Sequence, residues 1–192
     1  MKKIVSFLIA VFSLSFMLNG CGGAKLSPEV QKEFDSHATM YTQVNMHYNI
    51  NRRGVKLVEA TNYQVGILIP VNSKVTLIDI NSRQIAFEYK GHKIILKNIP
   101  KYTGLDMNGL VKRYFGKNKV NLSKFSSAER KAIESAKVIK GMSKDAVLVS
   151  LGYPPAHRTP SLKENKWTYW HNRWKTFVVE FKNSRTISEV NP

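Results

Sequence analysis

Between residues 55 and 96 apolar and polar side chains alternate with a period close to two. Five short segments rich in β-branched and aromatic residues follow one another there, at 55–58, 63–69, 74–79, 84–89 and 93–96. Turn-forming residues at 70–73, 81–82 and 90–91 separate the later segments at hairpin spacing. The pattern therefore predicts a small antiparallel β-sheet or an SH3-like barrel.

Helix signals lie on both sides of this β-rich segment. Ser27, Pro28 and Glu29 supply an N-cap, a proline at the first helical position and an acid in the first turn, so a helix is predicted over 27–38. After the strands, Thr103-x-x-Asp106 is similar to a capping box and predicts a helix that ends at Gly116. Residues 27–117 are thus predicted to form one β-rich domain with flanking helices.

The remaining residues change from a strand pattern to a helix pattern. The polar and basic segment 118–124 is the predicted link. Ser126-x-x-Glu129 is a capping box that predicts a helix to about residue 140, and Ser143 caps a second helix that Gly152 ends. Strands are predicted at 166–171, 175–181 and 186–190. With residues 125–192 read as two helices and three strands, the predicted fold class of the chain is α+β.

The first twenty residues have the pattern of an export signal. Lys2 and Lys3 precede an apolar run over 4–18, which is too short to span a membrane stably and has the length of a signal-peptide hydrophobic region. The chain's single cysteine, Cys21, follows in the sequence Leu-Asn-Gly-Cys. This segment resembles the bacterial lipobox, which implies cleavage before Cys21 and diacylglycerol on its sulfur. The alternative is an ordinary cleaved signal that leaves an incidental thiol.

The lipobox resemblance also implies where the protein is located. Residues 1–20 would be the signal peptide and residues 21–26 a lipidated tether. Gly22 follows the cysteine, in place of the aspartate that favours inner-membrane retention in Gram-negative lipoproteins, so the implied site is the outer membrane, facing the periplasm. Without Lys2 and Lys3 the formal net charge falls from +17 to +15. No cysteine remains for a disulfide, so apolar packing must supply the core.

A second resemblance covers residues 138–190. The residues that carry it, in the family's order, are Gly141-Met142-Ser143-Lys144, Leu151-Gly152-Tyr153-Pro154, Trp167-Thr168-Tyr169 and Val179-Glu180-Phe181. They resemble the small outer-membrane lipoproteins whose best-known member is the E subunit of the β-barrel assembly machine. This BamE-like resemblance implies an α-α-β-β-β domain. It also implies a protein-binding or scaffolding role among envelope proteins, in outer-membrane assembly or maintenance.

Two alternatives to that role stay open. The same glycine, serine and proline positions suit a helix-turn-helix corner with a purely structural purpose. Family members of this type have little chain before the domain, whereas here a β-rich segment precedes it. Use of the domain elsewhere in the envelope is therefore an equal alternative.

Basic residues outnumber acidic ones by 30 to 13, and many lie between residues 112 and 144. Nucleic acid would be the first partner considered for a cytosolic chain, but the export signal argues against it. The predicted partners are anionic lipid, lipopolysaccharide or cell-wall polymer, and the alternative is a solvated lysine-rich surface. The candidate binding residues are Lys112, Arg113, Arg130, Lys131, Lys140 and Lys144.

Two tryptophans are further candidates for contact with a partner. Trp170 lies on the strand face opposite Trp167 and Tyr169, and Trp174 follows in the next turn. They are predicted to form an interface patch or to cover a third layer of the fold.

The sequence contains no local signature of catalysis. Its five histidines, at 37, 47, 92, 157 and 171, include no pair at helical spacing that would suit zinc. There is no Gly-x-Ser-x-Gly elbow, phosphate-binding loop or dinucleotide fingerprint. A triad assembled from distant residues is the remaining enzymatic alternative. We therefore expect a non-enzymatic protein with no cofactor or metal.

Overall fold

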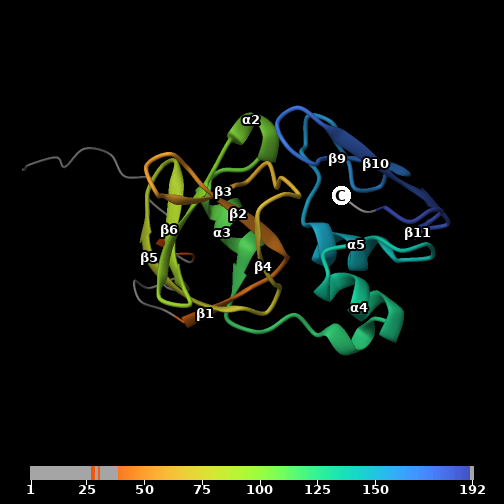
Figure 1. Ribbon diagram of the computed structural model, residues 1–192, viewed down its shortest axis with the longest axis horizontal. Helices are drawn as coiled ribbons and strands as arrows, with labels where there is room; N and C mark the ends of the chain where they lie inside the picture. Colours follow the sequence, from red (N-terminus) through yellow and green to blue (C-terminus); the bar gives the residue numbers. More distant parts are fainter. Residues whose placement is uncertain (1–26, 29, 31–38, 191–192) are drawn as a thin grey trace, which may run out of the picture.

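The structure is a computed structural model that describes residues 27, 28, 30 and 39–190 (Figure 1). The lipobox with Cys21, the tether and most of the predicted helix over 27–38 lie outside these residues. Val30, from that predicted helix, is buried in the hydrophobic core of the β-rich part.

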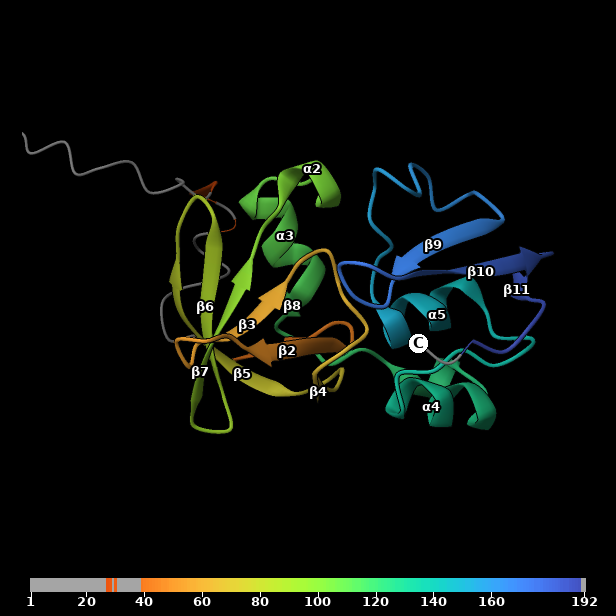
Figure 2. The ribbon, with the colours of Figure 1, turned by 45° about the horizontal axis from the view of Figure 1, so that its top comes forward.

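Eight strands form one curled, mixed sheet. They are β1 (Thr39–Thr42), β2 (Met46–Ile50), β3 (Lys56–Glu59), β4 (Ile67–Ile69), β5 (Lys74–Ile80), β6 (Gln84–Tyr89), β7 (His92–Lys97) and β8 (Phe115–Gly116). Their order across the sheet is β4-β2-β3-β7-β6-β5-β1-β8. Neighbouring strands are antiparallel except β3 and β7, which run parallel. The sheet curls around its own core, as Figures 1 and 2 show.

Two short helices follow β7. In α3 (Met107–Tyr114) the side chain of Asp106 accepts the backbone N–H of Gly109 at 2.8 Å, so Asp106 is the N-cap. The predicted cap at Thr103 is wrong, because that residue ends α2 (Pro100–Thr103). The apolar face of α3 packs on the sheet with Met107, Leu110, Val111 and Tyr114.

The C-terminal part consists of short helices and a second sheet. Its elements are the 3₁₀ helix η1 (Leu122–Lys124), α4 (Ser127–Glu134), α5 (Lys144–Leu151), β9 (Lys166–Trp170), β10 (Thr176–Lys182) and β11 (Arg185–Thr186). The predicted caps at Ser126 and Ser143 are confirmed, and Gly152 ends α5 as predicted. Trp167 and Tyr169 are fully buried in the core that includes α4 and α5. In Figure 2 the sheet of order β11-β10-β9 lies on one side of α5 and α4 on the other.

The predicted fold class is wrong. The described residues are mostly β, with an eight-stranded mixed sheet, a three-stranded sheet and short helices, instead of an α+β chain with a small antiparallel sheet or SH3-like barrel. The β-rich part contains three strands that were not predicted, β1, β2 and β8. Its sheet is mixed because β3 and β7 pair in parallel. The C-terminal residues do not form the BamE-like α-α-β-β-β arrangement. There α4 ends at Glu134 and Ala136 has a φ of 52°, so the predicted helix to residue 140 does not form.

Backbone carbonyls at the C-terminus of α5 are bound by amide groups from the large sheet and its loops. The last carbonyls of a helix have no partner within the helix. Here the carbonyl of Val149 accepts the backbone N–H of Asn45 at 3.0 Å, and that of Leu151 accepts the side-chain amides of Asn62 and Gln64. All three amide residues are buried. The two parts of the protein are therefore joined by buried polar bonds as well as by apolar packing.

Asn45 makes the largest number of these bonds. Its Nδ2 donates to the carbonyls of Ile133 in α4 and Ser150 in α5, at 2.6 and 3.0 Å. Its Oδ1 accepts the backbone N–H of Val71 at 2.7 Å. One side chain thus satisfies backbone groups from three separate segments.

Candidate anion-binding site

A cleft of about 260 Å³ lies where the large sheet and α3 meet α5. We call it the junction cleft. One wall carries residues of α3 and of the β1–β2 connection, and the other carries residues of α5 and the chain just after it. Its lining residues are Gln43, Val44, Lys112, Arg113, Lys124, Asp145, Leu148, Val149 and Tyr153.

Cations dominate the lining of the junction cleft. The lining includes three cations, Lys112, Arg113 and Lys124, and a single carboxylate, that of Asp145. Within the described part of the chain, ion pairs within 4.0 Å are confined to Lys166–Glu180 and Arg185–Glu129, so none involves the three cleft cations. The cleft therefore has a surplus of positive charge that no described side chain neutralises by direct pairing.

Arg113 is the most constrained of the three cations. Its guanidinium lies 4.2 Å from the centre of the Tyr153 ring, and Nη1 is 3.5 Å from the carbonyl oxygen of Thr103. Burial lowers its pKa, although an arginine remains protonated at neutral pH. A half-buried cation without a carboxylate partner has a desolvation cost that a bound anion would offset.

Two features of the fold bring the three cations to the cleft. Lys112 and Arg113 lie in the last turn of α3, where positive side chains are stabilised by the helix dipole. Lys124 comes from η1, and the segment before it is fixed to the sheet by Gln43, whose Nε2 donates to the carbonyl of Asn118 at 2.9 Å. The link between the two parts of the chain thus brings the third cation to the cleft.

The other predicted cations do not lie in the junction cleft. Arg130 and Lys131 are on α4, where the guanidinium of Arg130 donates to the carbonyl of Phe125. Lys140 is exposed in the turn between α4 and α5. Of the six predicted basic residues, Lys112 and Arg113 line this cleft.

Lys144 has an internal structural role. Its Nζ donates to the carbonyl oxygens of Leu162, Lys163 and Glu164 at 2.6 to 3.1 Å. The same ammonium lies 5.4 and 5.2 Å from the ring centres of Trp167 and Phe181. Because its three N–H groups are occupied, the prediction that Lys144 binds a partner is not supported by its geometry.

The two candidate tryptophans differ in environment. Trp170 is half-buried, with His157 stacked 6.3 Å from its ring centre, so it covers part of the fold. Trp174 is 81% exposed, in the turn between β9 and β10. That turn is ordered by Asn172, whose Oδ1 accepts the backbone N–H groups of Trp174 and Lys175 at 2.9 and 3.0 Å. Of these two tryptophans, Trp174 presents the larger exposed aromatic surface.

Lys124 and Tyr153 belong to the junction cleft but were absent from the predicted site. In the sequence, Lys124 is one of several lysines in the basic link, and Tyr153 belongs to the segment that ends a predicted helix. Each is separated from Arg113 by an entire element of the fold, so no local spacing could have joined them.

Comparison with known protein families, curated protein sequences and solved structures finds no match to this chain. The residues of the cleft are therefore the basis for inferring what the protein binds.

The described residues were also compared with the requirements of a metal site and of a membrane-spanning helix. They contain no group of three or more His, Cys, Asp and Glu side chains placed to hold a metal ion. None of the helices among them has the length and apolar character needed to cross a membrane.

Proposed function

We propose that this chain is a membrane-anchored, non-enzymatic envelope protein that binds a phosphate-bearing ligand in the junction cleft. The observation that carries the proposal is the group of Lys112, Arg113 and Lys124 around one hollow, with no ion-pair partner among the described residues. Arginine and lysine side chains donate several charge-assisted hydrogen bonds to phosphate oxygens.

The proposed location limits the ligands to those of a cell envelope. The lipobox resemblance supports an exported protein that is held by a lipid on Cys21 at the outer membrane and faces the periplasm. Phosphate groups occur there on lipid headgroups, on lipopolysaccharide and on wall polymers. These sources share one chemistry but differ in whether the phosphate is a monoester or a diester.

A protein-binding or scaffolding role is the second candidate function, and Trp174 is the observation that favours it. An exposed tryptophan on an ordered turn is a frequent anchor in protein interfaces. Arg173 lies 4.5 Å from the Trp174 ring centre and adds positive charge beside it. An outer-membrane or other envelope protein with an acidic, apolar pocket would complement this turn.

We expect the double variant K112Q/R113Q to bind glycerol phosphate at least about tenfold more weakly than the wild type, because two charge-assisted contacts are lost. Affinity is measured with the purified full chain by ³¹P NMR titration. A parallel titration with the diester glycerophosphoglycerol separates a terminal phosphate from a lipid-headgroup phosphate as the preferred source.

The matched control is R130Q/K131Q, which removes the same charge from α4, outside the cleft. It is expected to change the affinity less than about twofold, through screened long-range interactions only. K124Q provides a cleft variant that leaves the Arg113–Tyr153 contact in place. Equal losses in R130Q/K131Q and K112Q/R113Q would contradict the proposal.

The variant C21S is expected to move the protein from the membrane fraction to the soluble fraction. Two or three acyl chains hold a protein stably at a membrane, and the described residues contain no spanning helix to replace them. Fractionation of cells that express the full chain, followed by immunoblotting, measures the distribution. If C21S stayed with the membranes after a high-salt wash, lipid anchoring through this cysteine would be refuted.

A further inference from the structure

The junction cleft contains one acid that a bound phosphate group does not use. Asp145 lies in the first turn of α5, three and four residues before Leu148 and Val149. Residues at this spacing share one face of a helix, and all three line the cleft. A ligand in the cleft therefore meets a carboxylate as well as the three cations.

The Asp145 carboxylate is not neutralised by the cations of the cleft. Within the described part of the chain it has no ion-pair partner within 4.0 Å. Lys144, its neighbour in the chain, donates instead to three backbone carbonyls. One small hollow thus presents both signs of charge without pairing them, an arrangement that complements a ligand with both signs of charge.

Gln43 supplies a second acceptor in the lining of the cleft. Its Nε2 donates to the carbonyl oxygens of Tyr41 and Asn118 at 3.0 and 2.9 Å, so both amide N–H groups are used. The amide also lies close to Gly116, where an added Cβ would be 2.6 Å from Nε2. The Oε1 atom is left as an acceptor, which suits an N–H donor of a ligand and not a phosphate oxygen.

The rest of the lining is partly apolar. Val44 and Val149 are buried and Leu148 is half-buried. Methylene groups of a ligand would pack on these side chains. The volume of about 260 Å³ is below the range of about 300–1,000 Å³ that is usual for drug-sized ligands. The cleft therefore suits a small polar group, with any acyl chains outside it.

We propose that the junction cleft binds an aminoethyl phosphate, in which two methylene groups join a phosphate ester to a primary ammonium. This inference rests on the proposed function, because Lys112, Arg113 and Lys124 hold the phosphate. The ammonium donates to the Asp145 carboxylate and to Gln43 Oε1. A ligand that carries only negative charge leaves this carboxylate without compensation.

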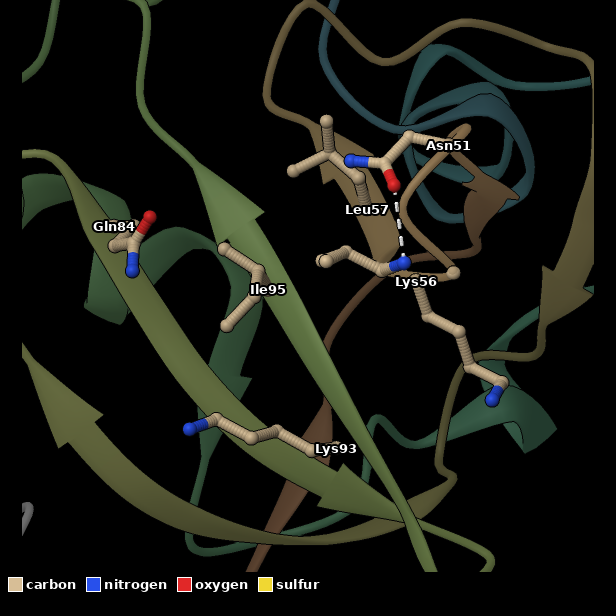
Figure 3. Close-up of a pocket in the computed structure, with 8 residues that line it drawn as sticks. Asn51, Lys56, Leu57, Gln84, Lys93 and Ile95 are labelled. Atoms are coloured by element: carbon tan, nitrogen blue, oxygen red, sulfur yellow. Dashed lines mark hydrogen bonds between the residues drawn. The ribbon is translucent and has the colours of Figure 1, made fainter.

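A larger hollow, of about 570 Å³ over β3 and β7, does not offer the same arrangement. Lys56 and Lys93 line it, but their side chains point away from each other (Figure 3). In the parallel register Lys56 is the partner of the buried Ile94, whereas Leu57 is the partner of Ile95 on the opposite face of the sheet. Replacing these two lysines is therefore a control for the loss of positive charge.

The experiment compares three probes by ³¹P NMR titration of the purified full chain at about pH 8, where the amine is protonated. They are O-phosphoethanolamine, its uncharged isostere propyl phosphate, and phosphocholine, in which methyl groups replace the N–H groups. We expect phosphoethanolamine to bind about three- to fivefold more tightly than propyl phosphate, the range of one exposed ion pair. Phosphocholine, which has no N–H donor, is expected to bind more weakly than phosphoethanolamine.

The variant D145N tests whether this acid is the source of the preference. It is expected to reduce the preference to less than about 1.5-fold and to leave propyl phosphate binding unchanged or tighter, because a repulsive charge is removed. The matched control D79N removes the same charge from an exposed position on β5 and should keep the preference. K56Q/K93Q should change both affinities less than about twofold.

The outcomes separate this inference from the proposed function. If phosphoethanolamine and propyl phosphate bound equally to the wild type, or if the preference persisted in D145N, the aminoethyl assignment would be wrong and the phosphate site would stand. If the wild type bound neither probe, both proposals would be wrong. A further titration with glycerophosphoethanolamine, a diester, distinguishes a lipid headgroup from a monoester as the source.

Discussion

Replacement of Asn45 by alanine lowers the free energy of unfolding by about 2–4 kcal/mol, because it leaves two buried backbone groups without a hydrogen bond. Those groups are the carbonyl of Ser150 and the N–H of Val71, whereas the carbonyl of Ile133 keeps the N–H of Ala136 as a second donor. The Asn45 side chain is buried between the large sheet and the C-terminal helices. Partial entry of water into the space left by the truncation keeps the loss below the sum of two full penalties.

Urea unfolding of the full chain, followed by far-ultraviolet circular dichroism and by tryptophan fluorescence, measures this loss. All three tryptophans lie at 167, 170 and 174, so fluorescence reports the C-terminal part while circular dichroism reports the whole chain. N49A is the control, because Asn49 lies in β2, the strand that follows Asn45, and makes one exposed bond, to the carbonyl of Val65. A loss in N45A no larger than in N49A would show that the buried amide network does not hold the two parts together.

Glu129 makes the stability of the C-terminal part depend on pH. Its burial by itself would raise the carboxyl pKa, but the N–H groups of Ser143 and Ser126 donate to it at 2.8 and 2.9 Å and lower the pKa to about 2. Arg185 adds an ion pair at 3.1 Å. The carboxylate thus joins the starts of α4 and α5 and the strand β11.

The sign of the pH effect follows from the lowered pKa. An acid whose pKa is lower in the folded than in the unfolded state stabilises the fold above its ordinary pKa, and this is lost as the pH falls toward the folded value. A fall from 4.5 to about 2 corresponds to about 3 kcal/mol. We expect the wild type to lose about this much more stability than E129Q between pH 6 and pH 2.5.

Urea titrations at several pH values measure the difference between the two proteins. E134Q is the matched control, because Glu134 is exposed on the same helix. It should follow the wild-type pH profile. Parallel pH profiles for the wild type and E129Q would refute the role given to this carboxylate.

Local features of the fold were predictable from the sequence. The capping box at Ser126 and the N-cap at Ser143 depend on residues three positions apart, and both form as expected. The strands β5, β6 and β7 lie within one residue of their predicted ends, because tight turns and alternating side chains define them. That Glu129 also binds the N–H of Ser143 could not be predicted, since this contact depends on the packing of α4 against α5.

Long-range features were not predictable, and they decide the fold class. Thr42 at the end of β1 and Asn45 just before β2 are polar residues at buried positions, so the apolar pattern of this segment is weak. Asn45 is buried because it binds backbone groups that are distant in the sequence. The parallel pairing of β3 with β7 joins segments separated by three other strands along the chain, and no turn signal specifies it.

The candidate site was predictable in part. Charge density pointed to Lys112 and Arg113, which do line the junction cleft. The same criterion selected Lys144, whose ammonium is bound by three backbone carbonyls, and it did not distinguish Lys124 from other lysines of the link. Composition therefore locates basic segments, but only the fold determines which cations face a common hollow.

The most direct test of the central claim is an NMR titration of the isotopically labelled full chain with glycerol phosphate. Binding in the junction cleft predicts saturable shifts of the Arg113 side-chain Nε–H signal and of the Lys112 and Lys124 signals, with Arg130 and Lys131 unmoved. Shifts at Arg130 and Lys131 as large as those at Arg113, or shifts that never saturate, would contradict a binding site in the cleft.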